Sequence, residues 1–121
     1  MNIVILDIKN VGLDLDFSPI TSLGNTTVYE NTLPEQIIER CIDAQCLVFN
    51  KVKMHADTLS KLPKLKLICV TATGYDNIDI DYCKAHGIAV CNVKGYSTQS
   101  VAQITVSLAL SLYSRLTEFN D

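Results

Sequence analysis

Apolar runs of strand length recur along the chain, separated by segments with helical signals. The five runs cover residues 2–7, 26–29, 46–49, 67–70 and 88–91. Near-continuous apolar runs of this length are typical of parallel strands that are buried on both faces. The run at 26–29 is more polar than the others, which predicts an edge strand.

Helix signals occupy the intervals between these runs. We expect helices over residues 16–23, 32–42, 55–62, 78–86 and 97–116. Thr32 offers a capping hydroxyl before Pro34, Gly87 ends the fourth helix, and Ser97 or Thr98 caps the last one. Strands that alternate with helices predict βαβ units with right-handed crossovers. The sequence therefore predicts an α/β fold of the flavodoxin-like type: a five-stranded parallel sheet in the order 2-1-3-4-5, with helices on both faces.

The last predicted helix is apolar around most of its circumference. Its polar positions form one narrow stripe, which comprises Ser100, Gln103, Ser107, Ser111, Ser114 and Glu118. Because an ordinary surface helix has a wider polar face, we expect this one to be covered on more than one side. It either folds back onto its own sheet, or extends and contacts a second domain or subunit. In the second case we expect a homo-dimer through residues 97–118.

Composition restricts the class of protein. The chain has 121 residues, of which 48% are hydrophobic and 19% charged, and this fits one globular core. The net charge of −3 gives no basic footprint, so we expect no nucleic-acid and no membrane partner. No apolar run approaches the roughly 20 residues that span a bilayer, and the first residues lack a signal-peptide pattern. We therefore expect a cytoplasmic protein.

The cysteines are odd in number and none form a C-x-x-C pair. They are Cys41, Cys46, Cys69, Cys83 and Cys91. Three of them lie within strand-like runs, where a cysteine acts as a small hydrophobic residue. We interpret them as structural, in a reducing compartment, and expect no metal site.

The stretch of residues 70–79 carries the strongest signal for a ligand site. It passes from an apolar strand through small residues to a helix start. Successive N–H groups at Ala72, Thr73 and Gly74 can bind a carboxylate or phosphate, because small side chains let a ligand approach the backbone. Thr71 and Thr73 would add hydroxyl donors. The alternative is a tight turn that needs glycine for its dihedral angles. The residues leave both interpretations open.

Polar residues follow the other strands as well. Asp7, residues 50–51 and residues 92–96 should share one edge of the sheet with Gly74, since the carboxyl ends of parallel strands meet there. Lysines in the two later segments can attract an anion, and Tyr96 can donate a phenolic hydrogen bond. Their convergence on one edge strengthens the prediction of a binding site.

Three other kinds of site are absent from the sequence. No G-x-G-x-x-G turn for a dinucleotide and no Walker phosphate loop occurs. His55 and His86 have no partner at triad or metal-ligand spacing. We expect His86, just before Gly87, to lie at a helix C-terminus, where positive charge is favourable.

Several segments, taken in order, resemble the NAD-dependent D-2-hydroxyacid dehydrogenases, with the glycerate (hydroxypyruvate) dehydrogenase branch nearest. They are residues 50–53, 70–79, 81–84, 86–88 and 92–103. The likeness covers the whole chain, but only about the first third of such an enzyme. It implies that residues 1–96 form a flavodoxin-like substrate domain. Residues 97–121 would form the long helix that crosses to a Rossmann NAD-binding domain absent from this chain.

The resemblance also implies roles for individual residues. Thr73 and Gly74 match the turn whose backbone N–H groups hold the substrate carboxylate. Tyr96 matches a position that faces the substrate, and Val101 one near the nicotinamide end of the cofactor. A loop that lines the same pocket is matched by Asn50, Lys51 and Val52. Ile104 departs from the family, which commonly has histidine there, at the domain boundary.

In the intact parent, the resemblance implies hydride transfer between NAD(H) and a 2-hydroxy or 2-keto acid. The family's catalytic arginine, glutamate and histidine lie further along and have no counterpart here. We therefore expect no catalytic residue, no bound cofactor and no dehydrogenase activity in the isolated chain, and only weak binding of a small acid. The alternative is a stand-alone flavodoxin-like binding module or a degenerate receiver domain, in which Asn50 replaces the phosphate-accepting aspartate.

Overall fold

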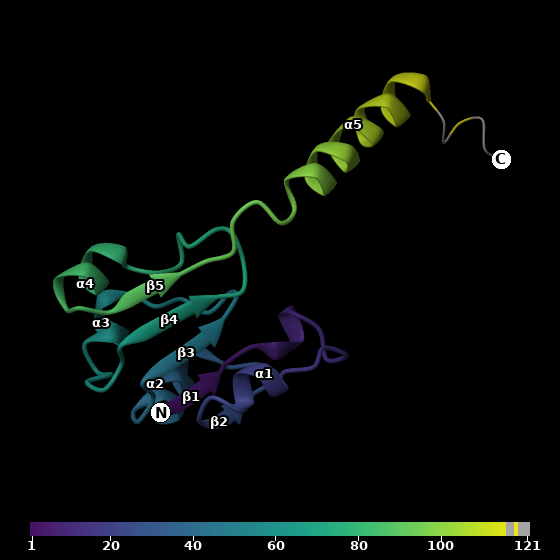
Figure 1. Ribbon diagram of the computed structural model, residues 1–121. Coiled ribbons are helices and arrows are strands. Elements are labelled where there is room, and N and C mark those ends of the chain that lie inside the picture. Colours follow the sequence, from purple (N-terminus) through teal and green to yellow (C-terminus); the bar gives the residue numbers. More distant parts are fainter. Residues whose placement is uncertain (116–117, 119–121) are drawn as a thin grey trace.

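The computed structural model describes residues 1–115 and residue 118, and its centre is one parallel five-stranded sheet (Figure 1). The strands are β1 (Asn2–Ile5), β2 (Asn25–Val28), β3 (Cys46–Phe49), β4 (Leu67–Val70) and β5 (Ala89–Cys91). Their order is β2-β1-β3-β4-β5, and every pair is parallel. The predicted fold and strand order are confirmed.

Helices lie on both faces of the sheet, but they cover the two faces unequally. The helices are α1 (Ser18–Thr21), α2 (Ile37–Cys41), α3 (Ala56–Leu59), α4 (Ile80–Ala85) and α5 (Thr98–Ser114), with 3-10 turns η1 (Ile8–Asn10) and η2 (Pro34–Gln36). On one face, α2, α3 and α4 enclose the larger core around Phe49 and Ile68. On the other, Phe17 and Ile20 pack beside Ile3, Ile5 and Val48, and β4 and β5 stay open.

Several predicted elements are shorter than expected. The strand predicted at 2–7 ends at Ile5, and α1, α3 and α4 are each shorter than the ranges predicted for them. For α4 the reason is the cap: the Asp79 carboxylate accepts from the Tyr82 N–H at 2.9 Å, so the helix begins after residue 79. Gly87 follows α4 with φ +68°, as expected of a residue that ends a helix.

The predicted cap at Thr32 is wrong. Its hydroxyl donates to the Leu6 carbonyl at 2.7 Å and accepts from Arg40 at 2.8 Å, so it joins the second helical segment to the end of β1. The segment itself is a 3-10 turn followed by α2 rather than one helix over 32–42. A buried tertiary contact has taken the hydroxyl that a cap would have used.

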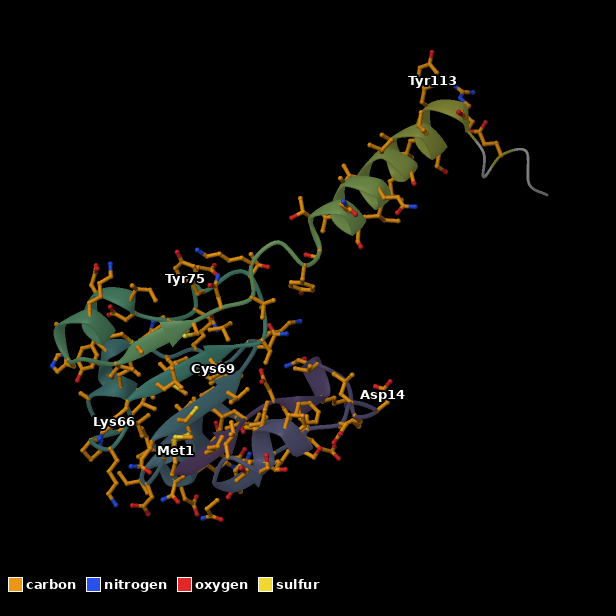
Figure 2. All side chains as sticks on the ribbon, viewed as in Figure 1. Met1, Asp14, Lys66, Cys69, Tyr75 and Tyr113 are labelled. Atoms are coloured by element: carbon orange, nitrogen blue, oxygen red, sulfur yellow. The ribbon has the colours of Figure 1, made fainter. Side chains whose placement is uncertain are left out.

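The last helix, α5, extends away from the sheet instead of folding back onto it (Figures 1 and 2). Its apolar side chains are exposed along its whole length, from Val101 at 56% to Tyr113 at 89%. Arg115 ends it in the left-handed region with φ 51°. The predicted end at Leu116 lies outside the described residues. Among the residues described, no helix is long and apolar enough to cross a membrane.

Candidate functional site

The carboxyl ends of the strands bring the predicted site segments to one edge of the sheet, as expected. The link between β1 and β3 is the Asp7 carboxylate, which is 2% exposed. It accepts hydrogen bonds from the Asn50 N–H at 2.9 Å and the Lys51 N–H at 2.8 Å, and from the Asn10 side chain at 3.1 Å. Both carboxylate oxygens are therefore occupied by the protein. Asp7 positions the loop after β3 and is not a free acid for a receiver-type reaction.

Asn77 joins the same loop to the turn after β4. Its side-chain amide donates to the Val52 carbonyl at 2.7 Å and to the Asn50 carbonyl at 3.2 Å. The Met54 N–H donates to the Asn77 carbonyl at 2.8 Å and so closes this connection from the backbone. The two loops consequently form one rigid edge, although they are more than 20 residues apart in the sequence.

The turn after β4 is in turn tied to β5. The Thr73 hydroxyl donates to the Val93 carbonyl at 2.8 Å, and the Asn92 side chain donates to the Thr73 carbonyl at 2.7 Å. The Val93 N–H donates to the Ala72 carbonyl at 3.1 Å. The hydroxyl proton of Thr73 is thus committed to the protein, and Thr73 is not a side-chain donor for a ligand, contrary to the prediction.

The backbone of this turn keeps its own donors. Within the described part of the chain, the N–H groups of Ala72, Thr73 and Gly74 donate to no backbone or side-chain acceptor. Gly74 and Thr73 are also exposed or half-exposed. Successive unpaired N–H groups on an exposed turn form a concave site suited to an oxyanion.

Gly74 separates the two interpretations that the sequence leaves open. Its φ lies outside the left-handed region, unlike that of Gly87 and Gly95. A Cβ added at Gly74 would meet only Asp76 Oδ1, at 3.7 Å, which is ordinary contact. The turn therefore does not need glycine for its dihedral angles or its packing. What the missing side chain does provide is room above the free N–H groups.

The predicted lining residues divide between two grooves. Asn50 and Tyr96 line an apolar groove over the open sheet face, together with Thr71. Lys51 and Val52 line a different groove beside Asp7, and Val52, with only 8% exposure, also belongs to the larger core. The structure therefore brings Asn50 and Tyr96 together and places Lys51 apart from them. Val101 lies on the extended helix α5, away from this edge.

Thr71 is half-buried, but its hydroxyl oxygen is fully buried at this edge and has no partner. Of the buried side-chain nitrogen and oxygen atoms in the described residues, its Oγ1 alone makes no hydrogen bond. A buried hydroxyl without a partner costs about 1–3 kcal/mol. The groove that Thr71 lines is also lined by Asn50 and Tyr96.

The histidines make no catalytic arrangement. His86 lies at the end of α4, as predicted, where its Nδ1 is 2.9 Å from the Tyr82 carbonyl and its ring stacks on Tyr82 at 3.8 Å. His55 precedes α3 without a side-chain cap bond. In the described residues, no group of three histidine, cysteine or acidic side chains is placed to hold a metal ion.

Comparison with known proteins identifies the family. Residues 5–118 match the model of the D-isomer specific 2-hydroxyacid dehydrogenase catalytic domain. The chain belongs to this family. It is 47% identical over 85 residues to the glycerate dehydrogenase of Methylorubrum extorquens. That match covers 69% of this chain and 27% of the relative. It is 35% identical over 126 residues to the hydroxypyruvate reductase of Blautia hydrogenotrophica, at 100% and 39% coverage.

A solved dehydrogenase structure agrees with the fold. The D-lactate dehydrogenase of Aquifex aeolicus, complexed with NAD and lactic acid, superposes with a TM-score of 0.81 at 29% identity. That match covers all of this chain and 36% of the dehydrogenase. The chain thus spans roughly a quarter to two fifths of the length of these three relatives. The family predicted from the ordered motifs is confirmed.

For this D-2-hydroxyacid dehydrogenase domain, sequence reasoning missed one positioning residue, Asn77, and the role of a second, Asp7. Asn77 lies inside the stretch of residues 70–79, but nothing in its local pattern shows that its amide reaches the loop after β3. Asp7 was predicted at the edge, yet its burial and its two backbone partners come only from the fold. An acid directly after the central strand is the one signal that pointed to it.

Because Asp7 alone links the loop after β3 to β1 through two charge-assisted bonds, we expect Asp7→Asn to destabilise the domain by about 2 kcal/mol. The amide keeps the shape but places an N–H₂ group against a backbone N–H. Urea unfolding followed by circular dichroism measures the change. Asp57→Asn, at an exposed position of α3, is the matched control and should change stability by less than about 0.5 kcal/mol. Equal effects of the two substitutions would contradict the role of Asp7.

Proposed function

We propose that this chain is the substrate-side part of a D-2-hydroxyacid dehydrogenase and that its 72–74 turn holds the carboxylate of a 2-hydroxy or 2-keto acid. The observation that carries the proposal is Gly74, whose side chain is missing where neither dihedral angle nor packing requires it. A carboxylate there would accept from the free N–H groups of Thr73 and Gly74. The unpartnered Thr71 hydroxyl and the groove residues Asn50 and Tyr96 lie at the same edge.

The loop after β3 supports the same site from a second side. Asp7 and Asn77 hold its backbone, so Asn50 reaches the edge on a rigid loop. Lys51 is exposed and adds positive potential near the edge rather than a direct contact. Val52 contributes through its buried side chain and its carbonyl. A pre-organised carboxylate site of this kind orients the acid and leaves its second carbon facing outward.

The residues of this chain do not form an NAD site by themselves. The glycines at 12, 24, 74, 87 and 95 do not make a dinucleotide turn, and Val101 lies on a helix that extends away from the sheet. In the proposal, residues 1–96 are the substrate domain and residues 97–121 lead to the NAD-binding part of the whole enzyme. A cytoplasmic location belongs to the same proposal, because all five thiols are free.

The carboxylate site is tested by titrating the chain with hydroxypyruvate and following backbone amide resonances. We expect weak binding, with a Kd of about 1 mM and the largest shifts at Thr73 and Gly74, since one wall of the pocket is missing. Gly74→Ala should weaken binding at least about tenfold and leave stability within about 0.5 kcal/mol.

Gly87→Ala is the matched control for that titration. Its φ of +68° strains any other residue, so it should cost about 1 kcal/mol of stability while binding stays unchanged. If Gly74→Ala instead destabilises the fold like Gly87→Ala and binds hydroxypyruvate normally, the turn is structural and the carboxylate site is wrong.

We expect the isolated chain to oxidise no NADH in the presence of hydroxypyruvate, because it supplies binding groups and no positioned acid or base. The assay follows absorbance at the NADH band with a glycerate dehydrogenase as positive control. Turnover that co-purifies with the chain and disappears in Gly74→Ala would overturn this part of the proposal.

Self-association through α5 is the second part of the proposal. From Thr98 to Ser114 the helix has no charged residue, and the hydroxyls of Thr105 and Ser107 bond back to carbonyls of their own helix. A 17-residue helix with no buried residue is marginal in water. Pairing with α5 of a second copy would bury the row formed by Val101, Ile104, Leu108 and Leu112.

Light scattering behind a sizing column tests this pairing. We expect a dimer for the unmodified chain and a monomer for Leu108→Lys, which places a charge in the apolar row. Ser107→Lys adds the same charge on the polar stripe and should remain a dimer. A monomer at about 100 μM for the unmodified chain would exclude a homo-dimer of useful strength.

A further inference from the structure

Three cysteines lie on neighbouring strands of the open sheet face. Cys46 is on β3, Cys69 on β4 and Cys91 on β5, and the register pairs Cys69 directly with Cys91. Cys46 is two residues from Val48, the partner of Cys69 on the other side, so it lies diagonal to Cys69. All three therefore project from the same face, since alternate residues of a strand share a face and paired residues lie side by side.

Access to the three thiols increases toward the edge of the sheet. Cys46 is 4% exposed, Cys69 is half-buried and Cys91 is exposed. The helix that packs on this face, α1, contacts the β1 and β3 side, which leaves β4 and β5 open (Figure 1). Figure 2 shows Cys69 in the middle of the sheet. A small oxidant can thus reach Cys69 and Cys91.

The spacing of the ladder suits a covalent bond between these two residues. Paired residues of adjacent strands have Cα atoms about 4.8 Å apart, and disulfides join Cα atoms about 4.4–6.8 Å apart. β5 is a three-residue edge strand with one neighbour, so it can shift slightly toward β4. Cys46, which is diagonal to Cys69 and buried, is less suitable as a bonding partner.

Cys46 has a different effect on the group. Its thiol donates a hydrogen bond to Cys69 and so holds the pKa of Cys69 down, at about 7, while the pKa of Cys46 itself is raised. Burial instead raises the pKa of Cys41 to about 12, and burial also raises the pKa of Cys83. Because the thiolate is the reactive form, we expect an oxidant to react first with Cys69.

We propose that Cys69 and Cys91 form a redox-responsive dithiol that a hydroperoxide closes to a disulfide. The Cys69 thiolate attacks one peroxide oxygen and breaks the O–O bond, which leaves a sulfenic acid on Cys69 and releases water or an alcohol. The Cys91 sulfur then attacks the Cys69 sulfur, the S–O bond breaks, and the oxygen leaves as water. The two thiols together lose two electrons and two protons, and the hydroperoxide is reduced.

The disulfide would join the two strands that lead into the candidate carboxylate site, and its effect on that site depends on the proposed function. Cys69 and Cys91 precede the segments that carry the bonds from Thr73 to Val93 and from Asn92 to Thr73. A covalent link between β4 and β5 shifts the distance between those segments. We therefore expect closure of the dithiol to change hydroxypyruvate affinity at least about threefold.

Peptide mapping after mild treatment with hydrogen peroxide tests the bond. The oxidised chain, with its remaining thiols blocked by N-ethylmaleimide, should migrate as a monomer without reductant. Trypsin should then release residues 67–84 joined to residues 85–94. Cys69→Ser should abolish this pair of peptides. Cys83→Ser is the control, because residue 83 lies in the same peptide as residue 69, and it should leave the linkage intact. Linkage of 67–84 to the peptide with Cys46, or no linkage once Cys69 is oxidised, would overturn the proposal.

Two further measurements test the effect of Cys46 on Cys69 and the effect of the disulfide on the carboxylate site. Cys46→Ala should move the midpoint of the pH profile for iodoacetamide labelling of Cys69 from about 7 toward the ordinary value near 9, a change that a purely structural role would not produce. If the disulfide forms and hydroxypyruvate affinity is unchanged, the coupling to the site is wrong while the carboxylate site stands. If neither redox form binds hydroxypyruvate, the proposed function fails, and the mass data alone decide the dithiol.

Discussion

The buried Asp7 carboxylate is the interaction on which the edge of this sheet depends. A loop that leaves a central strand exposes backbone N–H groups, and a buried N–H without an acceptor is costly. Asp7, which follows β1, accepts hydrogen bonds from the N–H groups of Asn50 and Lys51, which follow β3, so these N–H groups have an acceptor. Asn77 then carries the same constraint to the turn after β4. Asp7 therefore fixes the loop relative to β1, and Asn77 fixes the same loop relative to the turn after β4.

This arrangement explains why the domain tolerates a helix that stands apart. The core around Phe49 is closed by α2, α3 and α4, and the smaller cluster on the other face is closed by α1, so α5 contributes to neither. The edge of the sheet is held by polar side chains from the strand ends. The extended position of α5 exposes its apolar side chains to water, which is unfavourable. Because α5 belongs to neither core cluster, pairing through α5 would not change the packing of the sheet.

Much of the fold was predictable because its signals are local. The runs at 46–49 and 67–70 are strands with the predicted bounds, since they are apolar, rich in branched residues and bounded by polar segments. Long-range contacts account for the failures. Thr32 looks like a helix cap until β1 supplies the Leu6 carbonyl, and the Thr73 hydroxyl looks like a ligand donor until β5 supplies the Val93 carbonyl. The direction of α5 was undecidable from its sequence because an all-round apolar helix fits either packing.

The candidate site differs from its neighbours at the edge in that several of its hydrogen-bonding groups have no protein partner. Elsewhere along the edge, Asp7, Asn77, Asn92 and the Thr73 hydroxyl each have protein partners. At the turn itself, successive N–H groups and the buried Thr71 oxygen are not paired. Of these groups only the Thr71 oxygen is buried, and leaving it unpaired costs about 1–3 kcal/mol, whereas the N–H groups of Thr73 and Gly74 are exposed to water. In the proposed function, a carboxylate at the turn replaces the water on these N–H groups with a charged acceptor, and the turn is already held in place for it.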